Sequence, residues 1–120
     1  MTTQAIQSGD IFASAEWKDD SVPKVTLCKT EQIALDTYYM KPGQRLGYHR
    51  HPQGDQIFTV LEGEGTFYLD EGQEEKITVK PGSIFLAPAN AWHDLENTGS
   101  GNLIAQQVTK QPAGMEWRDK

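Results

Sequence analysis

Two nearly identical Pro-Gly corners divide the middle of this chain. "MKPGQ" occupies residues 40–44 and "VKPGS" occupies residues 79–83, and each is followed by a strand-like run and then by histidine. Proline presets φ and glycine tolerates positive φ, so each pair turns the backbone sharply between two extended segments. Two similar half-motifs in one small chain indicate two related β-sheets folded against each other.

Short strand patterns fill the rest of the chain, and signals for helices are nearly absent. Runs rich in β-branched and aromatic residues are separated by Gly, Pro, Asn or Asp at intervals of about 8 to 12 residues, which is typical of a sandwich or barrel. A chain of 120 residues can build one modest core. We therefore predict one all-β domain over residues 1–120, with a barrel core at about 30–110. The expected strands are residues 33–40, 56–63, 65–72, 76–82, 83–89 and 102–110, with a hairpin turn within 69–77.

The two ends of the chain fit this pattern less well. Trp17 and Trp117 lie in residues 1–28 and 111–120, and we expect these large aromatic side chains to cover the barrel or a partner subunit. An open jelly roll also leaves sheet edges and an apolar outer face to cover. The sequence therefore predicts a homodimer.

Charge and composition narrow the possible partners. The net charge is −6, from 11 basic and 17 acidic side chains, and the basic residues form no cluster. Phosphate backbones repel such a surface, so we expect no nucleic-acid partner. No run approaches the roughly 18 apolar residues of a membrane span, and the first residues have neither a basic leader nor an apolar block. Cys28 is the single cysteine, which cannot form an intrachain disulfide, and cytoplasmic residence is the expectation.

The chain has three histidines, and two of them, His49 and His51, are separated by one residue. Residues two apart in a strand point to the same face, so this pair is spaced to give two ligands to one metal ion. His93 follows the second Pro-Gly corner. If the two half-motifs face each other, His93 meets the pair inside the barrel.

Gln56 starts the strand after the histidine pair and offers an amide oxygen, either as a fourth metal ligand or as a pocket group for substrate or water. Asp55 is the alternative acid, but on an extended strand it faces away from Gln56, and we favour Gln56. Three imidazoles and an amide suit a divalent transition metal: iron, manganese, nickel, zinc or copper. Imidazole must be neutral to bind metal, so affinity should fall as the pH drops through roughly 6.5. A glutamate in place of Gln56 should hold the ion more tightly.

Other side chains are candidates for a substrate pocket or for the outer surface. Tyr39 and Phe58 are expected to line the pocket, and no general acid or base can be named. Arg45 is either a selector of acidic substrates at the barrel mouth or a surface residue. The solvated outer face is expected to hold Arg50, Asp94 and Glu96.

Two spaced motifs of this sequence resemble those of the cupins. The first family motif is a glycine, five residues, His-x-His, a gap of three or four residues, a glutamate, six residues and a glycine. Residues 43–63 keep this spacing, with Gln56 in place of the glutamate. The second family motif is a glycine, five residues, Pro-x-Gly, two residues, His, three residues and Asn. Residues 82–97 keep it with Asn90 in place of a glycine, and since Asn also tolerates a left-handed backbone, the turn should survive.

The resemblance implies a double-stranded β-helix, a jelly-roll barrel whose pocket holds one metal ion on His49, His51, Gln56 and His93. Some small cupins are dioxygenases, and a site of three histidines and one glutamine resembles that of cupins that open unsaturated uronates during pectin degradation. The resemblance therefore implies a metal-dependent enzyme, a dioxygenase or a sugar or uronate isomerase, acting on a small oxygenated molecule. The alternatives are a non-catalytic module that binds or senses a small ligand, and a metal store.

Overall fold

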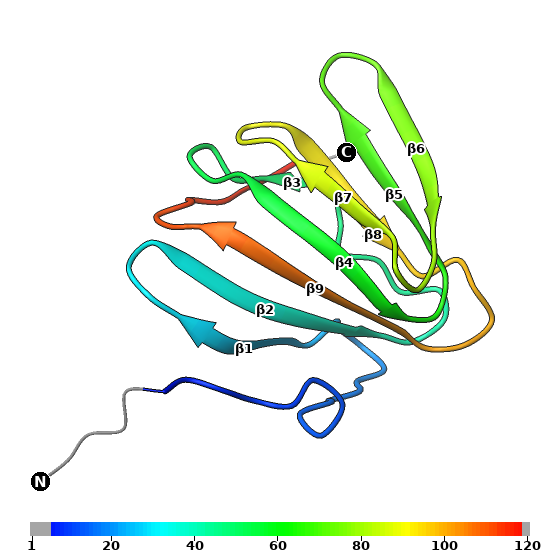
Figure 1. Ribbon diagram of the computed structural model, residues 1–120. Coiled ribbons are helices and arrows are strands. Elements are labelled where there is room, and N and C mark those ends of the chain that lie inside the picture. Colours follow the sequence, from blue (N-terminus) through cyan, green and yellow to red (C-terminus); the bar gives the residue numbers. More distant parts are fainter. Residues whose placement is uncertain (1–5, 119–120) are drawn as a thin grey trace, which may run out of the picture.

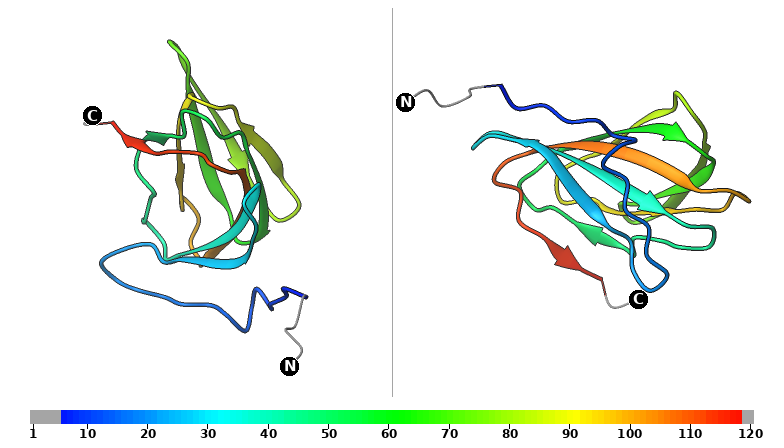
Figure 2. Two further views of the ribbon diagram at one scale, coloured as in Figure 1. Left: turned by 90° about the vertical axis from the view of Figure 1, so that its left-hand side faces the viewer. Right: turned by 90° about the horizontal axis from the view of Figure 1, so that it is seen from below.

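Two five-stranded antiparallel sheets packed face to face make up the computed structural model, which describes residues 6–118 (Figure 1). The first sheet has the strand order β1-β2-β9-β4-β7, and the second has the order β10-β3-β8-β5-β6. Figure 2 shows the same sheets from one side and from below. This arrangement confirms the predicted all-β class.

The strands are short and cover about half of the described residues. Those of the first sheet are β1 (Lys24–Lys29), β2 (Ile33–Met40), β9 (Leu103–Lys110), β4 (Gln56–Glu62) and β7 (Ile84–Ala87). Those of the second are β10 (Glu116–Trp117), β3 (His49–Arg50), β8 (Trp92–Glu96), β5 (Gly65–Asp70) and β6 (Glu74–Val79). β5 and β6 form the predicted hairpin. Within residues 6–118 there is no helix with the length and apolar character needed to cross a membrane.

The two Pro-Gly corners turn the chain as predicted. Gly43 and Gly82 have φ angles of 86° and 93°, which glycine adopts without a steric penalty. Asn90, with a φ of 68°, keeps the left-handed turn that precedes β8. The first corner leads the chain to β3, and the second leads it through β7 to β8. The two half-motifs therefore end on neighbouring strands of one sheet.

Side-chain alternation decides what each strand presents to the barrel interior. In β4, Gln56, Phe58 and Val60 are buried and point inward, whereas Ile57 is half exposed on the outer face. Inward side chains from both sheets form one apolar core. Its members are Tyr38, Met40, Phe58, Val60, Phe67, Val79, Phe85, Ala87, Leu95, Leu103 and Ala105.

The N-terminal segment covers the outer face of the first sheet beside β2. The hydroxyl of Tyr39 donates a hydrogen bond to the carbonyl of Ile11, and the ring of Trp17 meets the ring of Tyr39 edge-on at 5.5 Å. The expectation that Tyr39 lines the pocket is therefore wrong. Its neighbour Tyr38 takes the inward face of β2, so Tyr39 must point outward.

The C-terminal segment adds a strand to the second sheet. In β10, Trp117 lies opposite His49 of β3, and their ring centroids are 5.2 Å apart. Glu116 forms an ion pair with Arg50 of the same strand pair. Trp17 and Trp117 thus both lie against the barrel. Residues 1–5 and 119–120, the outermost parts of the segments for which we expected this role, lie outside the described residues.

Candidate metal centre

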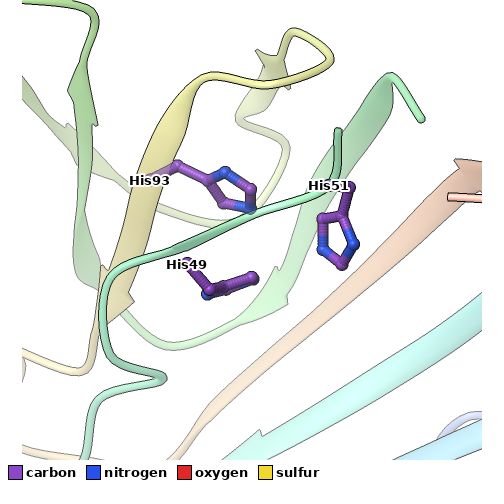
Figure 3. A group of neighbouring side chains, drawn as sticks. All are labelled: His49, His51 and His93. Atoms are coloured by element: carbon purple, nitrogen blue, oxygen red, sulfur yellow. The ribbon is translucent and has the colours of Figure 1, made fainter. Parts of the chain in front are cut away.

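Three imidazoles converge inside the barrel, two from neighbouring strands and one from the residue that follows the first of these strands (Figure 3). His49 in β3 lies directly opposite His93 in β8, and His51 follows two residues after His49. The ring centroid of His49 lies 5.2 Å from that of His51 and 4.3 Å from that of His93. Each residue contributes one ring nitrogen to the cluster, and these three nitrogens all lie within 4.8 Å of one another. All three residues are buried.

Backbone carbonyls fix which nitrogen of each ring faces the cluster. Each Nδ1 lies within hydrogen-bond distance of a carbonyl, and a carbonyl can only accept, so in each ring Nδ1 carries the proton. The pairs are His49 with Gly47 at 2.8 Å, His51 with Gly114 at 2.8 Å, and His93 with Ala91 at 3.0 Å. The three Nε2 atoms therefore keep free lone pairs, which is the state that binds a metal ion.

Hydrogen bonds also fix the orientation of the Gln56 amide, on the opposite sheet. Its amide nitrogen donates to the Oε1 of Gln107 at 3.0 Å and to the hydroxyl of Thr109 at 2.8 Å. Both amide hydrogens are then used, and the Oε1 of Gln56 has no hydrogen-bond partner although it is buried. Gln56 points inward on the same face of β4 as Phe58, whose ring lies 6.0 Å from that of His93.

Four of the buried acceptors without hydrogen bonds belong to inward side chains: the Nε2 atoms of the three imidazoles and the amide oxygen of Gln56. A buried polar atom without a partner destabilises a fold by about 1–3 kcal/mol, so four of them inside one barrel call for a ligand. Three imidazole nitrogens and one amide oxygen are suitable ligands for a divalent transition metal. The residues present therefore fit such an ion, whose identity this donor set leaves open.

Burial also keeps the imidazoles in the neutral form. It is the main cause that lowers the pKa of His49 and of His51, and it lowers the pKa of His93 to about 3. The neighbouring imidazoles add to the effect at His93, since two positive rings so close together repel each other. The cluster is therefore ready to bind a cation without first losing protons at neutral pH.

An ion pair behind the cluster holds the loop that carries His49. Asp94 is fully buried and accepts two hydrogen bonds from the guanidinium of Arg45, while its other oxygen accepts the backbone N–H of Gly47 at 2.8 Å. The carbonyl of Gly47 is the group that fixes the tautomer of His49. The expectation that Asp94 is solvated is wrong. Alternation with the inward His93 turns Asp94 to the outer face of β8, but the ion pair with Arg45 and the loop at Gly47 bury it there.

A cavity of about 370 Å³ opens beside the cluster, between the edge strands β1 and β10. Its walls come from both sheets and include Lys24, Tyr38, Arg45, His49, Met115 and Trp117. Arg45 thus lies at the cavity, as a selector of acidic substrates would. Its charge, however, is already paired with Asp94. Phe58 packs beneath His93 within the core rather than along this cavity. Lys24, Met115 and Trp117 were missed as candidates because nothing in their local sequence marks them.

A barrel of two antiparallel sheets with three inward imidazoles defines a class of small jelly-roll proteins with a candidate metal centre. The chain belongs to the cupin family, because the family model described as a cupin domain matches residues 37–106. The match includes both histidine motifs and confirms the resemblance seen in the sequence. It ends before the C-terminal segment that supplies Gly114 and Trp117.

Two curated relatives show how function varies among similar chains. An oxalate-binding protein of Thermotoga maritima is 33% identical over 64 residues, which are 53% of this chain and 50% of that protein. A 3-hydroxyanthranilate 3,4-dioxygenase of Paraburkholderia phytofirmans is 28% identical over 81 residues, which are 63% of this chain and 46% of that enzyme. The chain thus spans half or less of the length of these relatives, one a binding protein and one an enzyme.

Among solved structures, an uncharacterized conserved protein with a double-stranded β-helix domain from Klebsiella pneumoniae matches over the whole fold. The TM-score is 0.86, with 22% identity over 98% of this chain and 100% of that one. The likeness confirms the double-stranded β-helix.

Proposed function

We propose that this cupin holds a divalent transition metal ion on His49, His51, His93 and Gln56 and acts as a metal-dependent enzyme on a small carboxylate, with oxygenation as the favoured chemistry. The observation that carries the proposal is the set of four buried acceptors without hydrogen bonds. When bound, the ion supplies a Lewis acid with open positions, at which oxygen atoms of a substrate can be oriented and polarised.

Lys24 is the residue that selects a carboxylate in this proposal. It lies opposite Tyr38 in the β1–β2 pairing and therefore shares the inward face of the first sheet. Among the described residues it has no carboxylate partner, and it lines the cavity beside His49. After burial, its charge is a further cause that lowers the pKa of His49 and of His51, so its field reaches the cluster. An anion placed between Lys24 and the ion would meet two positive charges.

The cavity walls favour oxygenation over isomerisation. Isomerising a sugar or uronate requires a side chain that takes and returns a proton. Among the described residues that line the cavity none carries a carboxylate, and in this proposal Lys24 binds the substrate's carboxylate and His49 binds the ion. Tyr38 also lines the cavity, but burial and the charge of Asp36 raise its pKa, so it stays protonated and cannot act as the base. Oxygenation at a metal ion has no such need for a protein base.

A second candidate is carboxylate binding without turnover. The likeness to the oxalate-binding protein supports it, and the same Lys24 and metal would serve as the binding groups. The two candidates differ in one measurable property, which is whether a bound carboxylate is consumed together with oxygen.

The experiment loads the metal-free protein with Fe²⁺ and titrates it with oxalate, 3-hydroxyanthranilate and related small carboxylates while oxygen is recorded. Lys24→Gln should weaken carboxylate binding at least about tenfold, as expected for a charge-assisted contact. It should not weaken Fe²⁺ binding, because it removes a positive charge near the cluster. Lys29→Gln is the matched control, since Lys29 is in the same strand but lines a different cavity. Oxygen uptake supports the enzyme, and binding without uptake supports the second candidate. Equal effects of the two substitutions contradict the assigned role of Lys24.

A further inference from the structure

A chain of buried hydrogen bonds runs from the candidate metal centre to the edge of the first sheet. Gln56 donates to the Oε1 of Gln107, and the Nε2 of Gln107 donates to Asp36 at 3.3 Å. The hydroxyl of Thr26 donates to the other oxygen of Asp36 at 2.5 Å. Gln56, Gln107 and Asp36 are 1%, 2% and 5% exposed, so water offers them little alternative.

Asp36 decides which group donates and which accepts at each step of this series of hydrogen bonds. A carboxylate offers only acceptors, whereas an amide has an acceptor end and a donor end. Asp36 therefore requires the NH₂ end of Gln107, which leaves the oxygen of Gln107 facing β4. That oxygen in turn requires the NH₂ end of Gln56, and the oxygen of Gln56 is left to face the barrel interior.

We propose that Asp36, acting through Gln107, is a positioning residue that presents the oxygen of Gln56 rather than its nitrogen to the three imidazoles. This inference rests on the proposed metal centre and deepens it. The turned-away nitrogen is a donor and cannot bind a cation, so the orientation of Gln56 decides whether the fourth side chain can serve as a ligand at all.

The same series of hydrogen bonds explains why position 56 holds an amide where the family motif has a glutamate. With Asp36 in place, a carboxylate at position 56 would meet the oxygen of Gln107, and two acceptors would face each other. If Gln107 turned over to donate to that new carboxylate, its oxygen would face the carboxylate of Asp36. In either orientation of Gln107, two acceptor oxygens face each other without a proton between them. Both oxygens are buried away from water, so the contact is unfavourable.

Asp36→Asn and Gln56→Glu should therefore compensate each other. An asparagine introduced at position 36 can donate to the oxygen of Gln107, whose NH₂ end then turns toward position 56, where a glutamate accepts it. The double variant has the same net charge as the natural chain. The expectation from sequence alone, that Gln56→Glu tightens metal binding, should therefore hold only when Asp36 has also been replaced.

The first readout uses metal-free protein, so it is independent of any reaction. Gln56→Glu alone should lower the melting temperature by about 5 °C, and it should lower it by much less in the Asp36→Asn background. Asp20→Asn is the control background, because this exposed carboxylate lies outside the hydrogen-bonded chain. Gln56→Glu should lower the melting temperature equally in the Asp20→Asn variant and in the natural chain.

The second readout is the affinity for Co²⁺, measured by equilibrium dialysis. Asp36→Asn alone should weaken binding, since Gln107 and Gln56 are then free to turn their nitrogens toward the imidazoles. Gln56→Glu should improve Co²⁺ affinity about tenfold more in the Asp36→Asn background than with Asp36 present, which is the coupling typical of residues that share one network.

The two readouts separate the possible failures. If the effects of the two substitutions on the melting temperature simply add, the positioning role of Asp36 is refuted, whatever the metal does. If the melting temperatures are coupled but the natural chain binds no Co²⁺, the positioning role is supported and the proposed metal centre fails. Coupling in both readouts supports both.

Discussion

His49 and His93 lie directly opposite each other on the antiparallel strands β3 and β8, with their ring centroids 4.3 Å apart. This contact joins the two histidine motifs of the chain. A shift of the pairing by one residue would turn one ring to the other face of the sheet, so the register of β3 and β8 is a condition for the cluster. The neighbouring ion pair of Arg45 and Asp94 and the turns around these strands stabilise that register.

Removal of the buried carboxylate behind His49 tests this support. Asp94→Ala should lower the free energy of unfolding by about 2 kcal/mol, because the N–H of Gly47 and the guanidinium of Arg45 both lose a charged acceptor. Asp94→Asn keeps an acceptor for Gly47 and should destabilise less. The measurement is urea unfolding of the metal-free protein.

Asp19→Ala is the control for that experiment. Asp19 pairs with Lys41, but its side chain is 91% exposed, so its loss should change the stability little. Equal destabilisation by Asp94→Ala and Asp19→Ala would show that the buried ion pair does not support the loop.

The turn between β4 and β5 should be intolerant of any side chain. Gly63 has a φ of 82°, and a Cβ there would lie 2.1 Å from the carbonyl oxygen of Asn102. Gly63→Ala should therefore lower the free energy of unfolding by about 3 kcal/mol or more, from backbone strain and overpacking together. Gly82→Ala should cost only about 1 kcal/mol, since Gly82 has a similar φ but no atom within 4 Å of its Cβ position. Similar losses in thermal unfolding would contradict the packing at Gly63.

The stability of the metal-free protein should fall in acid because of the imidazole cluster. Burial lowers the pKa of His93 to about 3 and lowers those of His49 and His51, whereas each is about 6.5 in an unfolded chain. Between pH 6.5 and about 3 the unfolded chain therefore binds protons that the native protein excludes. The free energy of unfolding should decrease as the pH falls through this window, and it should be unaffected by these groups above it.

The same shift changes the expected pH dependence of metal binding. The affinity for Co²⁺ should be nearly constant between pH 7 and pH 6 and should fall only at lower pH, below the value of roughly 6.5 expected for free imidazole. His93→Gln should show a smaller dependence of its unfolding free energy on pH in the metal-free state. An unchanged dependence in that variant would mean that His93 is not held neutral by burial.

The strands that could be predicted from the sequence are those with a clear alternation. The expected strand at 33–40 coincides with β2, and those at 56–63 and 102–110 differ from β4 and β9 by one residue. β3 and β10 have two residues each and β8 mixes charged with apolar residues, so local sequence gives them no recognisable period. Pairing with neighbouring strands defines them instead.

The histidine cluster could be predicted because His49 and His51 have a two-residue spacing, and because the resemblance to the two cupin motifs implied that His93 joins them. The groups that hold its members could not. Asp94 and Arg45 are 49 residues apart, and Asp36 and Gln107 are 71 residues apart. Such contacts depend on which strands become neighbours, which the local pattern does not encode.

The most direct test of the account is the number of Co²⁺ ions bound by the metal-free protein, measured by equilibrium dialysis with elemental analysis. The natural chain should bind one ion per chain. His93→Ala, checked for native secondary structure by circular dichroism, should bind it more than about 100-fold more weakly, because loss of a ligand exceeds the effect of losing a group that only orients one. The absence of saturable binding, or the same affinity in a folded His93→Ala protein, would contradict the claim that His49, His51 and His93 hold one cation.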